Sequence, residues 1–243
     1  MTTFNTFSDI LPDPVNKITE AGDTDPRGVA GPGFSGVSFT SHGETQVSRT
    51  NSGSGVQRDQ GIQYWSFSIK YNPMLREQFE PVDAFLASRN ARKYPFFVIL
   101  PQYSRPRDPE FALFAKNNNI TIASTTLSGS SAIMISAASA ILGNPRIGDM
   151  FNIDDDANVN HLKTYKVTRV ETDQRYQSAT TAPTTLQKRI HISPPLLKDV
   201  EAGAKLVFIN PKFRVIAKSD LREYDLNTEQ LYSFSLDVEE IMP

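Results

Sequence analysis

The segment from Tyr64 to Pro101 constrains the fold most, because it contains a complete strand–helix–strand pattern. Near its start, polar residues alternate with large apolar ones, which indicates a strand with one buried face. The apolar residues of this strand are Trp65, Phe67, Ile69 and Tyr71. The continuous apolar run of residues 96–100, which includes Phe97, is typical of a buried strand. We predict that both strands belong to one sheet.

A helix between these strands is predicted from apolar residues spaced three or four apart, among them Phe79 and Phe85. Pro81 interrupts the pattern, so it either kinks one longer helix or begins a shorter one at its first position. We favour the shorter helix, from about Pro81 to Asn90, with a separate turn before it. Such a helix would cover the apolar face of the sheet.

The first 63 residues are rich in Gly, Ser, Thr and Pro, so regular helix is not expected there. Two interpretations remain open: a disordered tail, or an extended arm with one or two strands that becomes ordered against a neighbour. Apolar residues near the start, such as Phe4, Phe7, Ile10 and Leu11, favour docking onto another surface.

Residues 126–209 have a different residue pattern: short strand-like segments are separated by polar turns, as in a small barrel or sandwich. After them, Phe234 and Leu236 belong to a second aromatic-rich alternation that resembles the one at Trp65. We therefore predict a mainly β, α+β fold in which residues 64–125 and 210–243 form one domain. Residues 126–209 form an inserted β module in this interpretation, and residues 1–63 form an arm.

Composition argues against several functional classes. The net charge is −2, without the basic surface expected of a nucleic-acid binder, and no apolar stretch is long enough to span a membrane. The start of the chain lacks the features of a signal peptide. The chain has no cysteine, so disulfides and Cys-ligated metals are excluded. We expect no cofactor.

The best candidate for chemistry is an acidic run, residues 154–156, followed by two asparagines, which resembles the start of a calcium loop. The match fails where the loop requires glycine and glutamate, because Val159 and Tyr165 stand there. A polar hairpin tip explains the run equally well. The histidines are His42, His161 and His191, and none has a metalloprotease spacing. We expect no enzymatic activity.

Charged residues near two element ends are candidates for contacts between subunits. Arg89 and Arg92 follow the predicted helix, where they complement its dipole or bind an acidic neighbour. Glu239 and Glu240 end the last strand, where they protect an edge or form an ion pair between subunits. The residues predicted to form the core or to support assembly are Trp65, Phe67, Ile69, Phe79, Phe85, Phe97, Phe234 and Leu236.

The pattern W-x-F-x-I-x-Y-x-P, a helix containing AFL, a basic turn and the strand FFVILP resemble structural proteins of tailed bacteriophage tails. The later segments RIGDMFNI, TYKVTRVET, RIHISPPLLKDVEAGAKLVFI and YSFSLDVEEI extend the resemblance over residues 60–242. It implies a tail-tube-like β-sandwich with one packed helix, and a virion component near the distal tube or baseplate hub. It also implies synthesis in the host cytoplasm, a homo-oligomeric ring, hexameric or trimeric, and tube or baseplate proteins as partners. No catalytic residue is implied.

Two further functions remain open. The inserted module could bind a host glycan or cell wall, with Tyr165 and Tyr176 as the aromatic candidates. A tail-associated hydrolase would need acids such as Asp154 and Asp156.

Overall fold

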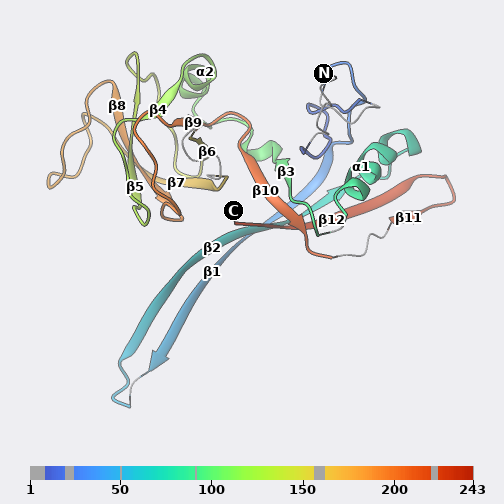
Figure 1. The fold of residues 1–243 in the computed structure, drawn as a ribbon, viewed down its shortest axis with the longest axis horizontal. Helices are drawn as coiled ribbons and strands as arrows, with labels where there is room; N and C mark the ends of the chain where they lie inside the picture. The colour runs from blue at the N-terminus through green and yellow to red at the C-terminus, as the bar shows by residue number, and fades with distance from the viewer. Residues whose placement is uncertain are drawn as a thin grey trace, which may run out of the picture. The chain divides into compact units, whose positions relative to one another are not determined.

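A computed structural model describes residues 9–19, 25–49, 51–90, 92–155, 162–219 and 224–242, with only the backbone described for 44–46 and 56–62. The protein is mainly β, with two α-helices in the described part. The chain forms two compact units. The first comprises Met1–Val98 and Arg214–Ile241, and the second comprises Ile99–Phe213 and the last two residues. The second unit is thus inserted into the first (Figure 1).

The first unit is built on one curled sheet. Its strands follow the order β1 (Phe34–Arg49), β2 (Gly55–Tyr71), β12 (Tyr232–Glu240), β10 (Lys212–Ala217) and β3 (Phe96–Ile99). A short strand, β11 (Tyr224–Leu226), pairs with the beginning of β12. Strands β2 and β12 are antiparallel neighbours, with Ile69 opposite Leu236. The two aromatic-rich alternations are therefore adjacent, and their large residues share one face.

Helix α1 (Arg76–Ser88) packs on this apolar face. The Phe79 ring lies 4.7 Å from that of Tyr232 and 5.8 Å from that of Phe234, and the Phe85 ring lies 5.7 Å from that of Phe96. The described part of this unit contains a single sheet covered by a helix, where the resemblance implied a two-sheet sandwich.

The predicted start of this helix at Pro81 was wrong. Helix α1 begins at Arg76, contains Pro81 in its interior and ends at Ser88. An interior proline removes one backbone hydrogen bond and costs about 3 kcal/mol relative to alanine. The aromatic contacts of Phe79 in the turn before Pro81 offset this cost. Asn90 adopts a left-handed conformation with φ of 53°, which ends the helical path before the predicted boundary.

The second unit contains a closed six-stranded barrel. Around it the order is β4 (Ile120–Ile122), β5 (Ala132–Ala137), β8 (Gln187–Ser193), β7 (Thr164–Glu171), β6 (Met150–Asp154) and β9 (Lys205–Val207). A 3-10 turn, Pro101–Tyr103, and helix α2 (Pro109–Asn117) precede the barrel. Asp108 caps α2 by accepting hydrogen bonds from the backbone N–H groups of Glu110 and Phe111.

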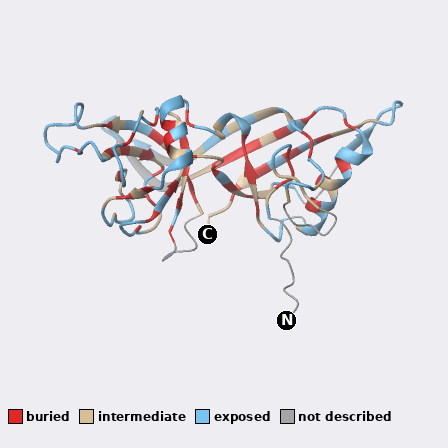
Figure 2. Ribbon diagram, turned by 90° about the horizontal axis from the view of Figure 1, so that it is seen from above, coloured by how far each residue is buried: buried red, intermediate tan, exposed pale blue. Residues whose placement is uncertain are grey.

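Aromatic side chains fill the barrel. The Phe151 ring lies 5.0 Å from that of Phe208 and 5.9 Å from that of Tyr165, and all three side chains are buried. Phe111 of α2 meets Phe208 edge to face, so the helix closes part of this core. Figure 2 shows buried residues on the strands and exposed residues in the outer loops.

The unit boundaries differ from those predicted. Residues 99–125 were assigned to the first domain, yet α2 and β4 belong to the barrel unit. Strand β4 joins β5 to β9 and so completes the barrel, and Phe111 and Phe114 of α2 enter its core. The described part of residues 1–63 contains β1 and the beginning of β2, so strands are present there, but both belong to the sheet of the first unit. Neither helix in the described part is long and apolar enough to cross a membrane.

Candidate functional site

The two edges of the sheet in the first unit differ. Residues 9–11 run along β3, where the Leu11 N–H donates to the Phe97 carbonyl at 2.8 Å and the Phe97 N–H donates to the Asp9 carbonyl at 2.7 Å. At the opposite edge, β1 pairs with β2, and no other described strand pairs with β1. A 16-residue strand thus presents one open edge, which is a template for another strand.

The same strand forms a hairpin that extends past the rest of its sheet. The β2–β12 pairing ends at Ser66 opposite Glu239, while the β1–β2 pairing continues to Arg49 opposite Gly55. Within the described residues, the far half of this hairpin is therefore paired only with itself, as Figure 1 shows. Its tip includes Gly53, whose φ of 82° suits glycine. We call residues 41–64 the hairpin extension.

The base of the hairpin extension is firmly attached to the sheet. The Phe39 ring stacks on Trp65 at 5.0 Å and on Phe67 at 6.0 Å. The Trp65 backbone N–H donates to Glu240 Oε2 at 3.1 Å, just where the β12 ladder ends. On the other face, the His42 ring stacks on Tyr64 at 4.7 Å. A rigid base therefore supports a two-stranded projection.

The residues predicted to form the core fall into two groups. Seven are buried in the first unit: Trp65, Phe67, Ile69, Phe79, Phe85, Phe234 and Leu236. Phe97 is only half-buried. Every other residue of the run 96–100 is buried, including Phe96 and Val98 on either side of Phe97, and Phe96 meets Phe85 of α1. The alternation of a strand puts Phe97 on the opposite face.

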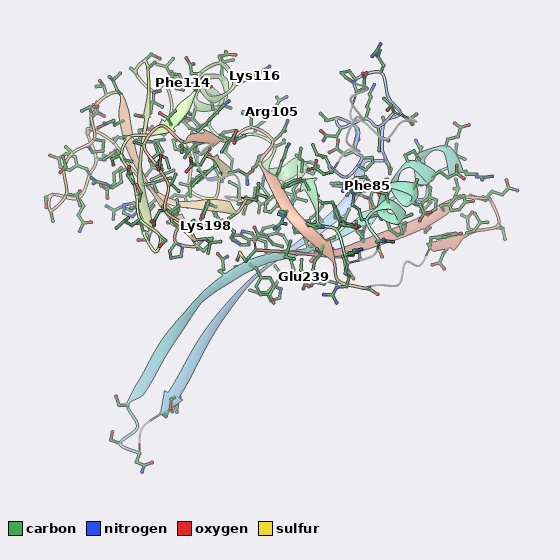
Figure 3. All side chains as sticks on the ribbon, viewed as in Figure 1. Phe85, Arg105, Phe114, Lys116, Lys198 and Glu239 are labelled. Atoms are coloured by element: carbon green, nitrogen blue, oxygen red, sulfur yellow. The ribbon has the colours of Figure 1, made fainter. Side chains whose placement is uncertain are left out.

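All four predicted interface residues have partners within the chain. Arg92 Nη2 lies 3.1 Å from Glu239 Oε1, and Glu240 is buried against the Trp65 backbone. The Arg89 guanidinium lies 4.7 Å from the centre of the Phe85 ring, and burial lowers its pKa. Phe85 and Glu239 are labelled in Figure 3. These contacts within one copy already account for the positions of all four residues.

The described residues offer little for catalysis. His42 Nε2 lies 2.7 Å from Ser66 Oγ, which is the spacing of a general base and a nucleophile. Ser66 is buried within the sheet, however, so the contact fixes two neighbouring strands. Among described residues, no group of three or more His, Asp or Glu side chains is arranged to bind a metal ion. Residues 156–161, which include His161, Asp156 and both asparagines of the acidic segment that was compared with a calcium loop, lie outside the described ranges.

A buried charge network on the barrel was not predicted. Glu171 at the end of β7 is 1% exposed and lies 2.9 Å from Arg189 Nη1, 2.9 Å from His191 Nε2 and 3.2 Å from Arg169 Nη2. Burial acts to raise its pKa, but hydrogen bonds from His191 and Arg189 outweigh this effect and lower the pKa to about 2. The sequence signal was weak, because these charges become neighbours only across two paired strands.

The network also fastens the β7–β8 loop, residues 172–186. The Gln177 N–H donates to Glu171 Oε2 at 3.4 Å, and Arg189 donates to Thr180 Oγ1 and, at 2.7 Å, to the Thr181 carbonyl. The loop is therefore held at its base by side chains of the barrel wall. It presents Tyr176, which is 44% exposed.

Lys188 lies at one end of the barrel and was not predicted either. This buried side chain donates to the Gly143 carbonyl and, at 2.6 Å, to Asn144 Oδ1. Burial lowers its pKa, while the nearby acids, Asp173 first among them, act in the opposite direction. The contacts identify Lys188 as a bridge from β8 to the loop before β6.

No family model matches the chain, and no curated protein sequence matches it.

Proposed function

We propose that this protein is a structural, non-enzymatic subunit of a bacteriophage tail, and that copies assemble into a hexameric ring in the distal tube or baseplate hub. The main support is the open edge of β1 together with the hairpin extension. The sequence resemblance over residues 60–242 supports the assignment to a tail. Other tube or baseplate proteins are the proposed partners, and the tail of the virion is the proposed location after synthesis in the host cytoplasm.

The open edge of β1 and the hairpin extension are both unfavourable in an isolated copy. A two-stranded ribbon is marginally stable in water unless it packs against something else. An open strand edge carries unpaired N–H and C=O groups that invite another strand. In a closed ring, the edge of each copy meets a neighbour, and no edge is left over. Assembly thus covers the open edge of β1 and supports the hairpin extension by contacts with a neighbouring copy.

The test is the mass of the full chain in solution, measured by light scattering after size exclusion, with negative-stain images of the same peak. We expect rings or stacks of rings. A variant that replaces residues 44–62 with Asn-Gly should be a monomer, because a tight turn can then join Gly43 to Gln63, which already pair. Emission of Trp65, which is the single tryptophan, checks that the shortened protein remains folded.

Leu113→Ala is the matched control, because this exposed barrel residue lies outside the hairpin. It should assemble like the wild type. A wild-type protein that remains a monomer at all concentrations, alone and with tail partners, would refute the proposal. Assembly that persists after removal of the hairpin extension would refute the role of the hairpin.

Glycan binding by the barrel remains the alternative, but its two aromatic candidates differ in exposure to solvent. Tyr165 is fully buried in the barrel core, which corrects its assignment as an exposed platform, whereas Tyr176 is exposed on the β7–β8 loop. Carbohydrate platforms require accessible rings, so only Tyr176 of the two remains available. Binding of the isolated protein to a glycan panel, lost in Tyr176→Ala, would favour this alternative.

A further inference from the structure

The two units carry opposite net charge. The second unit has thirteen Lys and Arg against ten Asp and Glu, a net charge of +3, whereas the first has twelve against seventeen, a net charge of −5. Residues 164–193 hold five of the basic residues and two acidic ones, and therefore contain the whole positive excess of the barrel unit. The charge of the protein is thus segregated even though its total is only −2.

Four of these five basic residues lie on the outside of the barrel. Lys188 lies on the same face of β8 as Ile190 and Ile192 and is buried as they are, so it faces inward. The others alternate out of the barrel or lie in the loop that follows β7. We call them the cationic wall: Lys166, Arg169, Arg175 and Arg189.

The cationic wall is held in place before any partner arrives. The Glu171 carboxylate hydrogen-bonds with Arg189 and His191 and forms an ion pair with Arg169, so one carboxylate faces two arginines of the wall. Backbone hydrogen bonds between Thr172 and Arg175, at 2.9 and 3.2 Å, form a tight turn that continues β7. Ordered side chains lose less entropy when they bind, so such a surface is suited to recognition.

Arg175 of the cationic wall and the adjacent Tyr176 are both exposed. Arginine and tyrosine are enriched among residues that contribute most to protein–protein binding. Their place at the base of a fastened loop gives them a defined position on a rigid barrel. A protein partner with negative charge fits this combination.

The outer face of α1 has the complementary charge. Glu77 and Glu80 are exposed on the side of the helix away from Phe79 and Val82, and the half-exposed Asp83 lies at the border of the buried face. Arg76 is the one basic residue of the helix and pairs with Glu80. The helix thus has a net charge of −2 on its solvent side, within a unit of net charge −5.

We propose that the cationic wall of one copy docks on the acidic outer face of α1 in the neighbouring copy. The inference rests on the proposed function, since it names a second contact within the same ring. Different surfaces meet in this contact, so it is heterologous, and a heterologous contact closes into a ring when its rotation allows. Opposite charges steer the copies together and fix which surfaces meet.

The experiment uses charge reversal in the full chain. Lys166→Glu with Arg175→Glu reverses the wall without touching the Glu171 network. Glu77→Lys with Glu80→Lys reverses the helix face. We expect each double variant to weaken self-association at least tenfold in sedimentation velocity at 50 mM NaCl. The variant with all four changes restores the complementarity and should return to within threefold of the wild type.

A matched control separates a specific contact from net charge. Lys116→Glu with Lys198→Glu changes the charge of the barrel unit by the same amount. Lys116 is on α2, and Lys198 follows β8 at the end away from the β7–β8 loop; both are labelled in Figure 3. This control should associate like the wild type. Wild-type association should also weaken as NaCl rises to 500 mM, because salt screens exposed charges.

The possible failures are distinguishable. If the wild type associates and the reversals leave it unchanged, or if the fourfold variant stays weak, the docking contact is refuted while the proposed assembly stands. If the wild type associates at no salt concentration, alone or with tail partners, both are refuted. Trp65 emission and far-UV circular dichroism confirm that each variant is folded.

Discussion

The barrel and the sheet solve the problem of strand edges differently. In the barrel, each of the six strands has a neighbour on both sides, so its ladders close without help from outside. In the first unit, residues 9–11 cover the β3 edge, but no described strand covers β1. The described barrel thus leaves no strand edge open, whereas the sheet of the first unit leaves one edge open, and this is the edge that the proposed assembly would cover.

The largest expected effect tests whether the barrel is an independent folding unit. Phe151→Ala should destabilise it by about 3–5 kcal/mol, because this buried ring contacts Phe208 and Tyr165 and its loss leaves a cavity. In a urea titration, the far-UV transition should gain an early phase while Trp65 emission, which reports on the first unit, stays unchanged. Equal shifts of both signals would contradict independence, and Leu113→Ala is the surface control.

A smaller effect is expected at the charge network of the barrel. Glu171→Gln should cost about 2 kcal/mol at pH 7, because Arg189 and His191 lose a charged acceptor. The folded-state pKa of Glu171, about 2, is below its ordinary value of 4.5, so the stabilisation is present above pH 4.5 and is lost as the pH falls toward 2.

Urea titrations of the wild type and of Glu171→Gln between pH 2 and pH 7 check this dependence. The difference in unfolding free energy between the two proteins should shrink as the pH falls through this window. A difference that is constant with pH would contradict the role of the Glu171 charge. The first unit, followed by Trp65 emission, should not respond to the substitution.

In the first unit, the neighbouring acids Glu239 and Glu240 should contribute differently to the free energy of unfolding. Glu240→Ala should cost about 1–2 kcal/mol, because the buried Trp65 N–H loses this acceptor. Arg92→Ala, which breaks the exposed pair with Glu239, should cost less than about 1 kcal/mol. Trp65 emission during urea unfolding measures both. Equal costs would contradict the assignment of Glu240 as the residue that secures the hairpin base.

The smallest effect is expected at Tyr71. Its hydroxyl is buried and has no hydrogen-bond partner in the described part of the chain, and burial raises its pKa above the usual range. Removing an unsatisfied buried polar group has little cost, so Tyr71→Phe should change stability by less than about 1 kcal/mol and in the stabilising direction. Thermal unfolding of the two proteins checks this, and a clear loss would show that the hydroxyl is satisfied.

Parts of this architecture could be predicted from local patterns. The alternation at residues 65–71 and again near Phe234 identified two half-buried strands, and an apolar spacing of three and four located a helix near Phe79 and Phe85. Such patterns are readable because each strand or helix buries one face, which imposes its own period on the sequence. The same reasoning indicated a mainly β fold with a barrel module.

One or two strands in the first 63 residues were among the interpretations left open, but the pairing of β1 and β2 into one long hairpin, the candidate assembly surface, could not be predicted in this way. Its segments are rich in Gly, Ser and Thr, and they look like loop because ladder hydrogen bonds across the hairpin, rather than side-chain periodicity, define the two strands.

The sequence by itself determined which faces of the strands and helices are apolar, because burial depends on the side chains within a few residues. Only the tertiary structure decided which distant segments meet. It brought Glu240 to the Trp65 backbone, Glu171 to Arg189 and α2 into the barrel. These contacts join residues far apart in the chain or on different strands, and their energy depends on exact distance and burial, which no local period records.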